Sequence, residues 1–113
     1  MIQIFHNPRC KKSREGLAIL QEANLDFEII KYLDTPPSEK ELSDIITKLG
    51  IQPIDLVRTK ETIWKEHFKR KELSDAAVIK AMVTYPKLIE RPIVLKDNKA
   101  VLGRPPEAIK DIL

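Results

Sequence analysis

The chain contains a single cysteine, Cys10, and the residues around it favour a reactive thiol. An apolar strand pattern over 2–5 and a short polar turn precede it, and an amphipathic helix pattern follows it. A thiol at a helix N-terminus faces unpaired backbone N–H groups and the positive end of the helix dipole. Four cations lie close in sequence: Arg9, Lys11, Lys12 and Arg14. We predict that Cys10 is a nucleophile with a pKa below the unperturbed value of about 8.5. The alternative is a small buried apolar residue.

Counting cysteines excludes several kinds of thiol chemistry. One cysteine cannot form an internal disulfide or a multi-cysteine zinc site, and His6 and His67 have no recognisable ligand spacing, so no metal is expected. A Cys-x-x-Cys pair would need a second thiol at Ser13, and a tyrosine-phosphatase loop would need an arginine at Gly16. A redox reaction at Cys10 would therefore need a resolving thiol from another molecule.

Composition indicates one domain over residues 1–113. Hydrophobic residues make up 42% of the chain, and it has neither a membrane-spanning run nor a signal-peptide pattern, so a cytoplasmic protein with no membrane partner is expected. The net charge of +3 comes from 20 basic and 17 acidic residues spread along the chain, which is typical of a solvated surface. No RNA-reading or DNA-reading motif occurs, and aromatic residues are only 5%, so no nucleic-acid partner is expected.

The N-terminal third predicts a strand, a helix and a strand. The helix covers about 11–23, and Asn24 can take the left-handed position at its end. A second strand follows over 27–32, and a strand-helix-strand order favours a parallel pair. A capping box, Ser38 to Glu41, then opens a helix that Gly50 ends.

The rest of the chain predicts short helices and then a hairpin. Helical pieces are expected from Pro53 to Val57, around Trp64, and from Ser74 through Met82. Strands over 93–96 and 99–102 flank the two-residue turn Asp97-Asn98, and Pro105-Pro106 opens a last helix. This order, βαβ, helices, ββα, predicts an α/β, thioredoxin-like fold with a helical insertion at about 38–90, between the second and third strands.

Three arginines, Arg58, Arg91 and Arg104, lie where an element meets a loop. A guanidinium suits a tetrahedral oxyanion because its planar fork donates two hydrogen bonds and stays charged. Each arginine alone could equally be a solvated or salt-bridged surface residue. Their occurrence together with Cys10 predicts an oxyanion site.

The motifs together resemble the glutaredoxin-coupled arsenate reductase family, of which the chain would be a short member. The matching segments are His6-Asn7-Pro8-Arg9-Cys10 with Ser13-Arg14, Leu56-Val57-Arg58, Glu90-Arg91-Pro92-Ile93-Val94 and Gly103-Arg104-Pro105. The resemblance implies an oxidoreductase that reduces arsenate to arsenite with glutathione as co-substrate, glutaredoxin as partner and no bound cofactor.

The resemblance also implies roles for individual residues. Cys10 would attack arsenate or a similar tetrahedral oxyanion, the three arginines would hold that anion, and His6 and Ser13 would assist the thiolate. Asn7 and Pro92 would be structural residues near the site. By its similarity to the proline that faces the active cysteine in thioredoxin-like folds, Pro92 is predicted to follow a cis Arg91-Pro92 bond.

Two further readings stay open at this level. The chain could be a thioredoxin-fold binding protein without catalysis, or a transcription regulator related to the redox regulators that bind RNA polymerase. Those regulators typically carry a Cys-x-x-Cys pair, and Ser13 argues against a disulfide sensor here. The arginine trio favours an enzyme, because an interaction module has no need of oxyanion donors beside a thiol.

Overall fold

The computed structural model describes residues 1–69 and 71–113, and these form two units. Unit 1 contains Met1–Thr35 and Arg91–Leu113, so it joins the two ends of the chain. Unit 2 contains Pro36–Glu90. No helix within the described part of the chain is long and apolar enough to cross a membrane.

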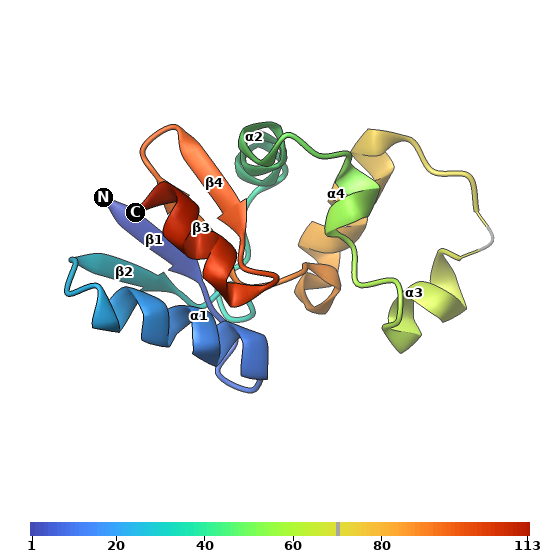
Figure 1. Ribbon diagram of the computed structural model, residues 1–113. Coiled ribbons are helices and arrows are strands. Elements are labelled where there is room, and N and C mark those ends of the chain that lie inside the picture. The colour runs from blue at the N-terminus through green and yellow to red at the C-terminus, as the bar shows by residue number, and fades with distance from the viewer. Residues whose placement is uncertain (70) are drawn as a thin grey trace. The chain divides into compact units, whose positions relative to one another are not determined.

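Unit 1 is built on a four-stranded sheet (Figure 1). Its strands are β1 (Ile2–Phe5), β2 (Phe27–Ile30), β3 (Ile93–Lys96) and β4 (Lys99–Leu102), in the spatial order β2-β1-β3-β4. Strand β1 pairs parallel with β2 and antiparallel with β3, which also pairs antiparallel with β4. In this register Ile4 lies between Ile29 and Val94. The central strand β1 therefore ends, at Phe5, directly before the loop that carries Cys10.

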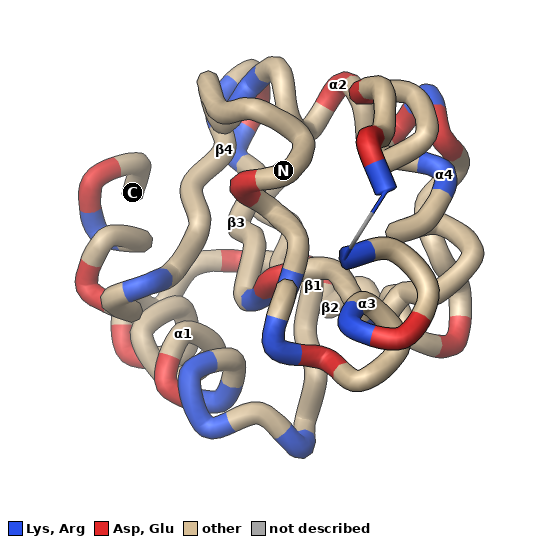
Figure 2. Tube along the Cα trace, turned by 90° about the vertical axis from the view of Figure 1, so that its right-hand side faces the viewer, with Lys and Arg blue, Asp and Glu red and all other residues tan. Residues whose placement is uncertain are grey.

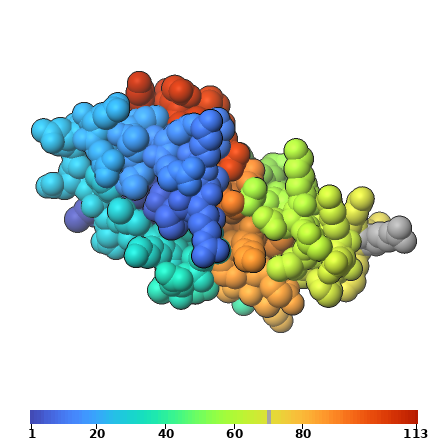
Figure 3. Space-filling model, turned by 90° about the horizontal axis from the view of Figure 1, so that it is seen from below, coloured from blue at the N-terminus to red at the C-terminus, as the bar shows by residue number. Residues whose placement is uncertain are grey.

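Two helices cover one face of this sheet: α1 (Lys11–Glu22) and the 3-10 helix η3 (Pro106–Ile112). The core between them consists of Ile2, Ile4, Leu20, Val94 and Ile109, all buried. Burial of one such side chain contributes about 1.5–3 kcal/mol. Seen from below, the atoms of α1 and the loop before it form much of the surface of unit 1, with η3 at its edge (Figure 3). Helix α1 is thereby packed against the sheet through Leu20.

Unit 2 is helical, with α2 (Glu39–Leu49), η1 (Pro53–Leu56), α3 (Thr62–His67), α4 (Asp75–Thr84) and η2 (Pro86–Leu88). The predicted capping box is present, because Ser38 Oγ accepts from the N–H of Glu41 and the Glu41 carboxylate accepts from the N–H of Ser38. Helix α2 ends at Gly50, whose φ of 69° is left-handed. A bridge between Val57 and Ile89 joins the residues after η1 to those after η2.

The predicted thioredoxin-like order is confirmed, as are the parallel pair, the hairpin and the left-handed Asn24 with φ of 59°. Three details differ. Strand β2 ends at Ile30, because the chain turns there and the N–H of Tyr32 bonds back to Ile30. The short helix from Pro53 and the last helix are 3-10 helices, a form common in short helical segments. Helix η2 was not predicted; it follows directly on α4.

Candidate active site

Cys10 is the N-cap residue of α1 and has an extended backbone, with φ of −97° and ψ of 124°. Its N–H donates to the carbonyl of Asn7 at 3.0 Å, and its carbonyl accepts from the N–H of Arg14 at 3.0 Å. The Arg14 guanidinium also bonds the carbonyl of Pro8 at 2.9 Å. The loop before α1 and its first turn are rich in lysine and arginine (Figure 2). The loop therefore holds the thiol, which is half-buried and forms no disulfide, at the positive end of α1.

The pKa of Cys10 lies below its ordinary value, as the sequence predicts. Partial burial of the thiol is the largest single effect, and it raises the pKa. The backbone N–H of Ser13, the guanidinium of Arg91 and the N–H of Lys12 together outweigh it, because each stabilises the thiolate. The strongest charge effect thus comes from Arg91, which lies far from Cys10 in sequence.

His6, Asn7 and Ser13 form a hydrogen-bonded group beneath the loop. The His6 Nδ1 lies 2.7 Å from Ser13 Oγ, and the same oxygen accepts from the N–H of Asn7 at 2.9 Å. The Asn7 side chain accepts from the N–H of Arg9 at 3.0 Å. All three residues are buried. The hydroxyl of Ser13 thus binds the loop, while its backbone N–H faces the Cys10 sulfur.

His6 is only 7% exposed, and its pKa is lowered. Burial is the main cause, and the charges of Arg14 and Lys31 act in the same direction, while the hydrogen bond to Ser13 opposes them. At neutral pH the imidazole is therefore uncharged. A neutral imidazole can exchange a proton with the Ser13 hydroxyl.

Two of the three predicted arginines lie beside Cys10. The Arg104 Nη2 donates to Cys10 Sγ at 3.7 Å, and its Nε donates to the carbonyl of Arg91 at 2.8 Å. Arg91 is 8% exposed, and among the described residues its buried Nε has no hydrogen-bond partner. A buried guanidinium N–H without a partner is costly. The site thus contains a thiol with a lowered pKa and two guanidinium groups, one of which has a buried donor without a partner among the described residues, and these are the parts of an oxyanion-binding site.

Two glycines let the backbone around Pro92 pack tightly, and their role was not predicted. A Cβ at Gly16 would lie 2.8 Å from Pro92 Cγ, and a Cβ at Gly103 would lie 2.7 Å from the same atom. Either Cβ would also press on Ile109 Cδ1. Gly16 inside a helix was the available signal, since a glycine there costs about 1 kcal/mol relative to alanine and often marks a close approach. The predicted cis Arg91-Pro92 bond is present, and Arg104-Pro105 is also cis.

Arg58, the third predicted arginine, lies in unit 2 and makes ion pairs there. Its Nη1 is 2.9 Å from Glu61 Oε1, and its Nε is 3.1 Å from Glu90 Oε1. Two carboxylates thus already balance the positive charge of Arg58, which an oxyanion would need for binding. Binding of an oxyanion by Arg58 stays a prediction.

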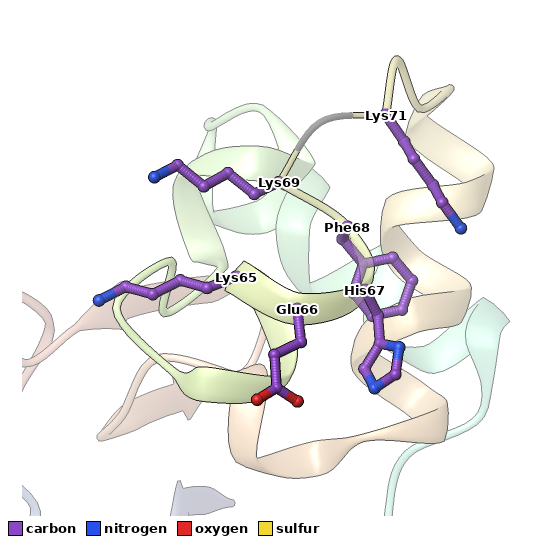
Figure 4. Close-up of a pocket in the computed structure, with 6 residues that line it drawn as sticks. All are labelled: Lys65, Glu66, His67, Phe68, Lys69 and Lys71. Atoms are coloured by element: carbon purple, nitrogen blue, oxygen red, sulfur yellow. The ribbon is translucent and has the colours of Figure 1, made fainter.

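Unit 2 also contains a cavity of about 400 Å³, and Arg58 is not among the residues that line it (Figure 4). It is lined by Lys65, Glu66, His67, Phe68, Lys69 and Lys71. Glu66 and His67 project to one side of the segment, and Lys65 and Lys69 project to another (Figure 4). The one cysteine of the chain lies in unit 1, so thiol chemistry belongs to the loop before α1.

Comparison with known proteins identifies relatives over nearly the whole chain. The ArsC family model matches residues 5–112. The arsenate reductase of Neisseria meningitidis is 46% identical, with 99% of this chain and 97% of that protein covered, and the arsenate reductase of Haemophilus influenzae is 43% identical, with 97% of each covered. A solved structure named arsenate reductase, from Vibrio cholerae, is 45% identical with a TM-score of 0.94, covering 99% of this chain and 97% of that one.

Proposed function

Because the chain belongs to the ArsC family, we propose that it is an arsenate reductase that uses Cys10 as its nucleophile. The observation that carries this proposal is the position of the thiol. Its sulfur lies 3.7 Å from Arg104 Nη2, and the buried Nε of Arg91 is free to donate. A tetrahedral anion bound by both guanidinium groups would place its central atom within reach of the sulfur. The thiolate would then be the attacking group.

The first step joins sulfur to arsenic. The Cys10 thiolate attacks the arsenic of dihydrogen arsenate, a sulfur–arsenic bond forms, and one arsenic–oxygen bond breaks. The departing hydroxide takes up a proton and leaves as water, so the arsenic stays pentavalent. The guanidinium groups of Arg91 and Arg104 stabilise the negative charge on the remaining oxygens. During this attack His6 and Ser13 would keep the loop before α1 in its conformation, and the proton between His6 Nδ1 and Ser13 Oγ would stay in their hydrogen bond.

Glutathione and glutaredoxin supply the electrons in this proposal. The glutathione thiol forms a second sulfur–arsenic bond, and a second water leaves. A glutaredoxin thiolate then attacks the glutathione sulfur, giving a mixed disulfide, while the electron pair of that sulfur–arsenic bond stays on arsenic and reduces it to the trivalent state. Water cleaves the remaining bond to Cys10, which releases arsenite and the free thiol. The external thiols are required because the chain has no second cysteine.

Two further expectations accompany the proposal. Arg58 would add to the oxyanion site, at the expense of its ion pairs with Glu61 and Glu90. The protein would act in the cytoplasm, because a single thiol that depends on glutathione needs a reducing compartment.

The proposal is tested by measuring arsenite release from arsenate by the purified chain. The complete mixture contains glutathione and glutaredoxin, and each is omitted in turn. We expect arsenite only in the complete mixture. No arsenite from the complete mixture would favour a binding protein without catalysis, and undiminished arsenite without glutaredoxin would contradict the electron route.

A further inference from the structure

Strand β2 forms one edge of the sheet in unit 1 (Figure 1). Within the described part of the chain its only strand neighbour is β1. The carbonyl of Ile30 accepts from the N–H of His6 at 3.0 Å, so the backbone groups of Ile30 face β1. Backbone groups of successive strand residues face opposite sides, so those of Phe27 and Ile29 face outward. The edge thus offers backbone donors and acceptors to an added strand.

Apolar side chains gather along this edge. Of the large apolar side chains that the structure describes as exposed, three lie in β2 or within a few residues of it: Leu25 at 41%, Ile29 at 42% and Leu33 at 37%. The opposite edge strand, β4, carries none of these exposed apolar residues and begins at Lys99. A lysine on an edge strand opposes pairing with another strand. The two edges therefore differ, and β2 is the one suited to pairing.

The exposed apolar residues are placed symmetrically about Ile29. Leu25 lies four residues before it and Leu33 four residues after it. When two identical strands pair antiparallel about a two-fold axis, one residue lies opposite itself, and residues equally far from it face each other. With Ile29 on the axis, Leu25 of one copy lies toward Leu33 of the other. The outward N–H and C=O groups of the two Ile29 residues then exchange two hydrogen bonds.

The neighbouring registers are less favourable. A shift that puts Glu28 opposite Glu28 brings two carboxylates together, and like charges directly opposite each other are destabilising. A shift that puts Ile30 opposite Ile30 requires the carbonyl of Lys31 as the acceptor for the N–H of Ile29. That carbonyl already accepts from the N–H of Asp34 at 3.0 Å. The charges and the hydrogen bonds therefore both favour the register centred on Ile29.

We propose that β2 binds a second copy of this chain, antiparallel and with Ile29 opposite Ile29. The two four-stranded sheets then form one continuous sheet. Ile29 lies opposite Ile4 in the sheet register, so its side chain is on the face that α1 covers, and the two Ile29 side chains meet on that face. The paired segment is short, and small interfaces are typical of weak, reversible association. The inference does not depend on the reaction at Cys10.

Sedimentation velocity and amide hydrogen exchange of the full chain test the proposal between about 10 µM and 1 mM protein. The dimer fraction should rise over this range, and exchange of the outward Ile29 N–H should slow about two-fold or more. Ile29→Lys should raise the dimer Kd about 10-fold or more, because two ammonium groups then lie opposite each other. Ile54→Lys makes the same change at a side chain of similar exposure, 44%, in unit 2, and should leave the Kd unchanged. Circular dichroism confirms that each variant is folded.

A mixture of two variants tests the register itself. Ile29→Lys and Ile29→Glu should each dimerise poorly alone, whereas their equimolar mixture should dimerise about 10-fold more tightly than either, because opposite charges then face each other. A parent chain that stays monomeric up to about 1 mM would overturn the proposal, and the edge would then be free for a strand of another protein. Unchanged association of Ile29→Lys, or a mixture no tighter than its components, would also overturn it.

Discussion

Replacing Gly103 with alanine tests how tightly the site is built. The N–H of Gly103 donates to the carbonyl of Pro92 at 2.8 Å, and the next residue, Arg104, bonds the carbonyl of Arg91. A Cβ at position 103 would lie 2.7 Å from Pro92 Cγ and 3.0 Å from Ile109 Cδ1. Real Cβ atoms do not approach a neighbour to less than 3.0 Å, so the rigid proline ring must move. Such a movement would displace Arg91 and Arg104 together.

The expected cost follows from two opposing effects. Forcing one extra methyl group into a packed region costs about 1–3 kcal/mol. Gly103 has no positive φ, so alanine also restricts the unfolded chain and returns about 0.4–1 kcal/mol. The net loss in the free energy of unfolding should lie between about 0 and 2.6 kcal/mol, with a midpoint of about 1.3 kcal/mol. Each kcal/mol should lower the Tm by about 4–8 °C.

A double-mutant cycle with Ile109→Val checks whether crowding around the new Cβ at position 103 causes the loss of stability. Valine removes Cδ1 from Ile109 and by itself should cost about 0.5–1.5 kcal/mol. Because the new methyl group can move toward the vacated space, the double variant should be more stable than the sum of the two single losses by about 0.5 kcal/mol or more. Gly50→Ala with Ile109→Val is the control pair, since no atom lies within 4 Å of a Cβ at position 50. Strict additivity of Gly103→Ala and Ile109→Val in denaturant unfolding would refute the reasoning.

Three further outcomes are expected. The rate of Cys10 alkylation, followed against pH, should show an inflection below about 8.5, and it should move upward in Arg91→Met, which loses both the hydrogen bond and the charge that help to lower this pKa. An inflection unchanged by that substitution would deny Arg91 its electrostatic role. Arg91→Lys and Arg104→Lys should each raise the KM for arsenate about 10-fold or more, because lysine cannot make the two hydrogen bonds of the guanidinium fork. A hydrogen bond to a charged group contributes about 1.5–3 kcal/mol. An unchanged KM in both variants would show that these arginines do not bind arsenate through such hydrogen bonds. Because the pKa of His6 is lowered in the fold, its contribution to stability is full above about pH 6.5 and is lost as the pH falls. The free energy of unfolding of the parent chain should therefore fall more steeply from pH 7 to 5 than that of His6→Gln, with His67→Gln as control, and parallel slopes would contradict the burial effect.

Local patterns predicted the elements that position the thiol and the first helix of unit 2. The strand before Cys10, the helix after it and the capping box at Ser38 depend on neighbours within a few residues, so each has a signature in sequence. The hairpin around Asp97 was predicted on the same basis. The 3-10 form of η1 and η3 was not, because an apolar pattern over so few residues does not distinguish the two helical forms.

Contacts between distant segments could not be predicted in the same way. The low pKa of Cys10 was predicted from its neighbours in sequence, whereas the charge effect on this pKa comes from Arg91, which the sequence analysis had placed at the site only as a ligand of the oxyanion. The bond from Arg104 to the carbonyl of Arg91 depends on how β4 follows β3, and the tight packing of Gly103 on Pro92 depends on η3. These features arise only once the sheet has formed.

The reaction at Cys10 is tested most directly by comparing the parent chain with Cys10→Ser in the arsenite assay. Both proteins are given arsenate, glutathione and glutaredoxin, and circular dichroism confirms that the variant is folded. A serine hydroxyl is not ionised at neutral pH, and the chain contains no other thiol that could take its place. We expect arsenite from the parent chain and only the protein-free background from Cys10→Ser. Arsenite release by the folded variant near the parent rate would contradict the central role of Cys10.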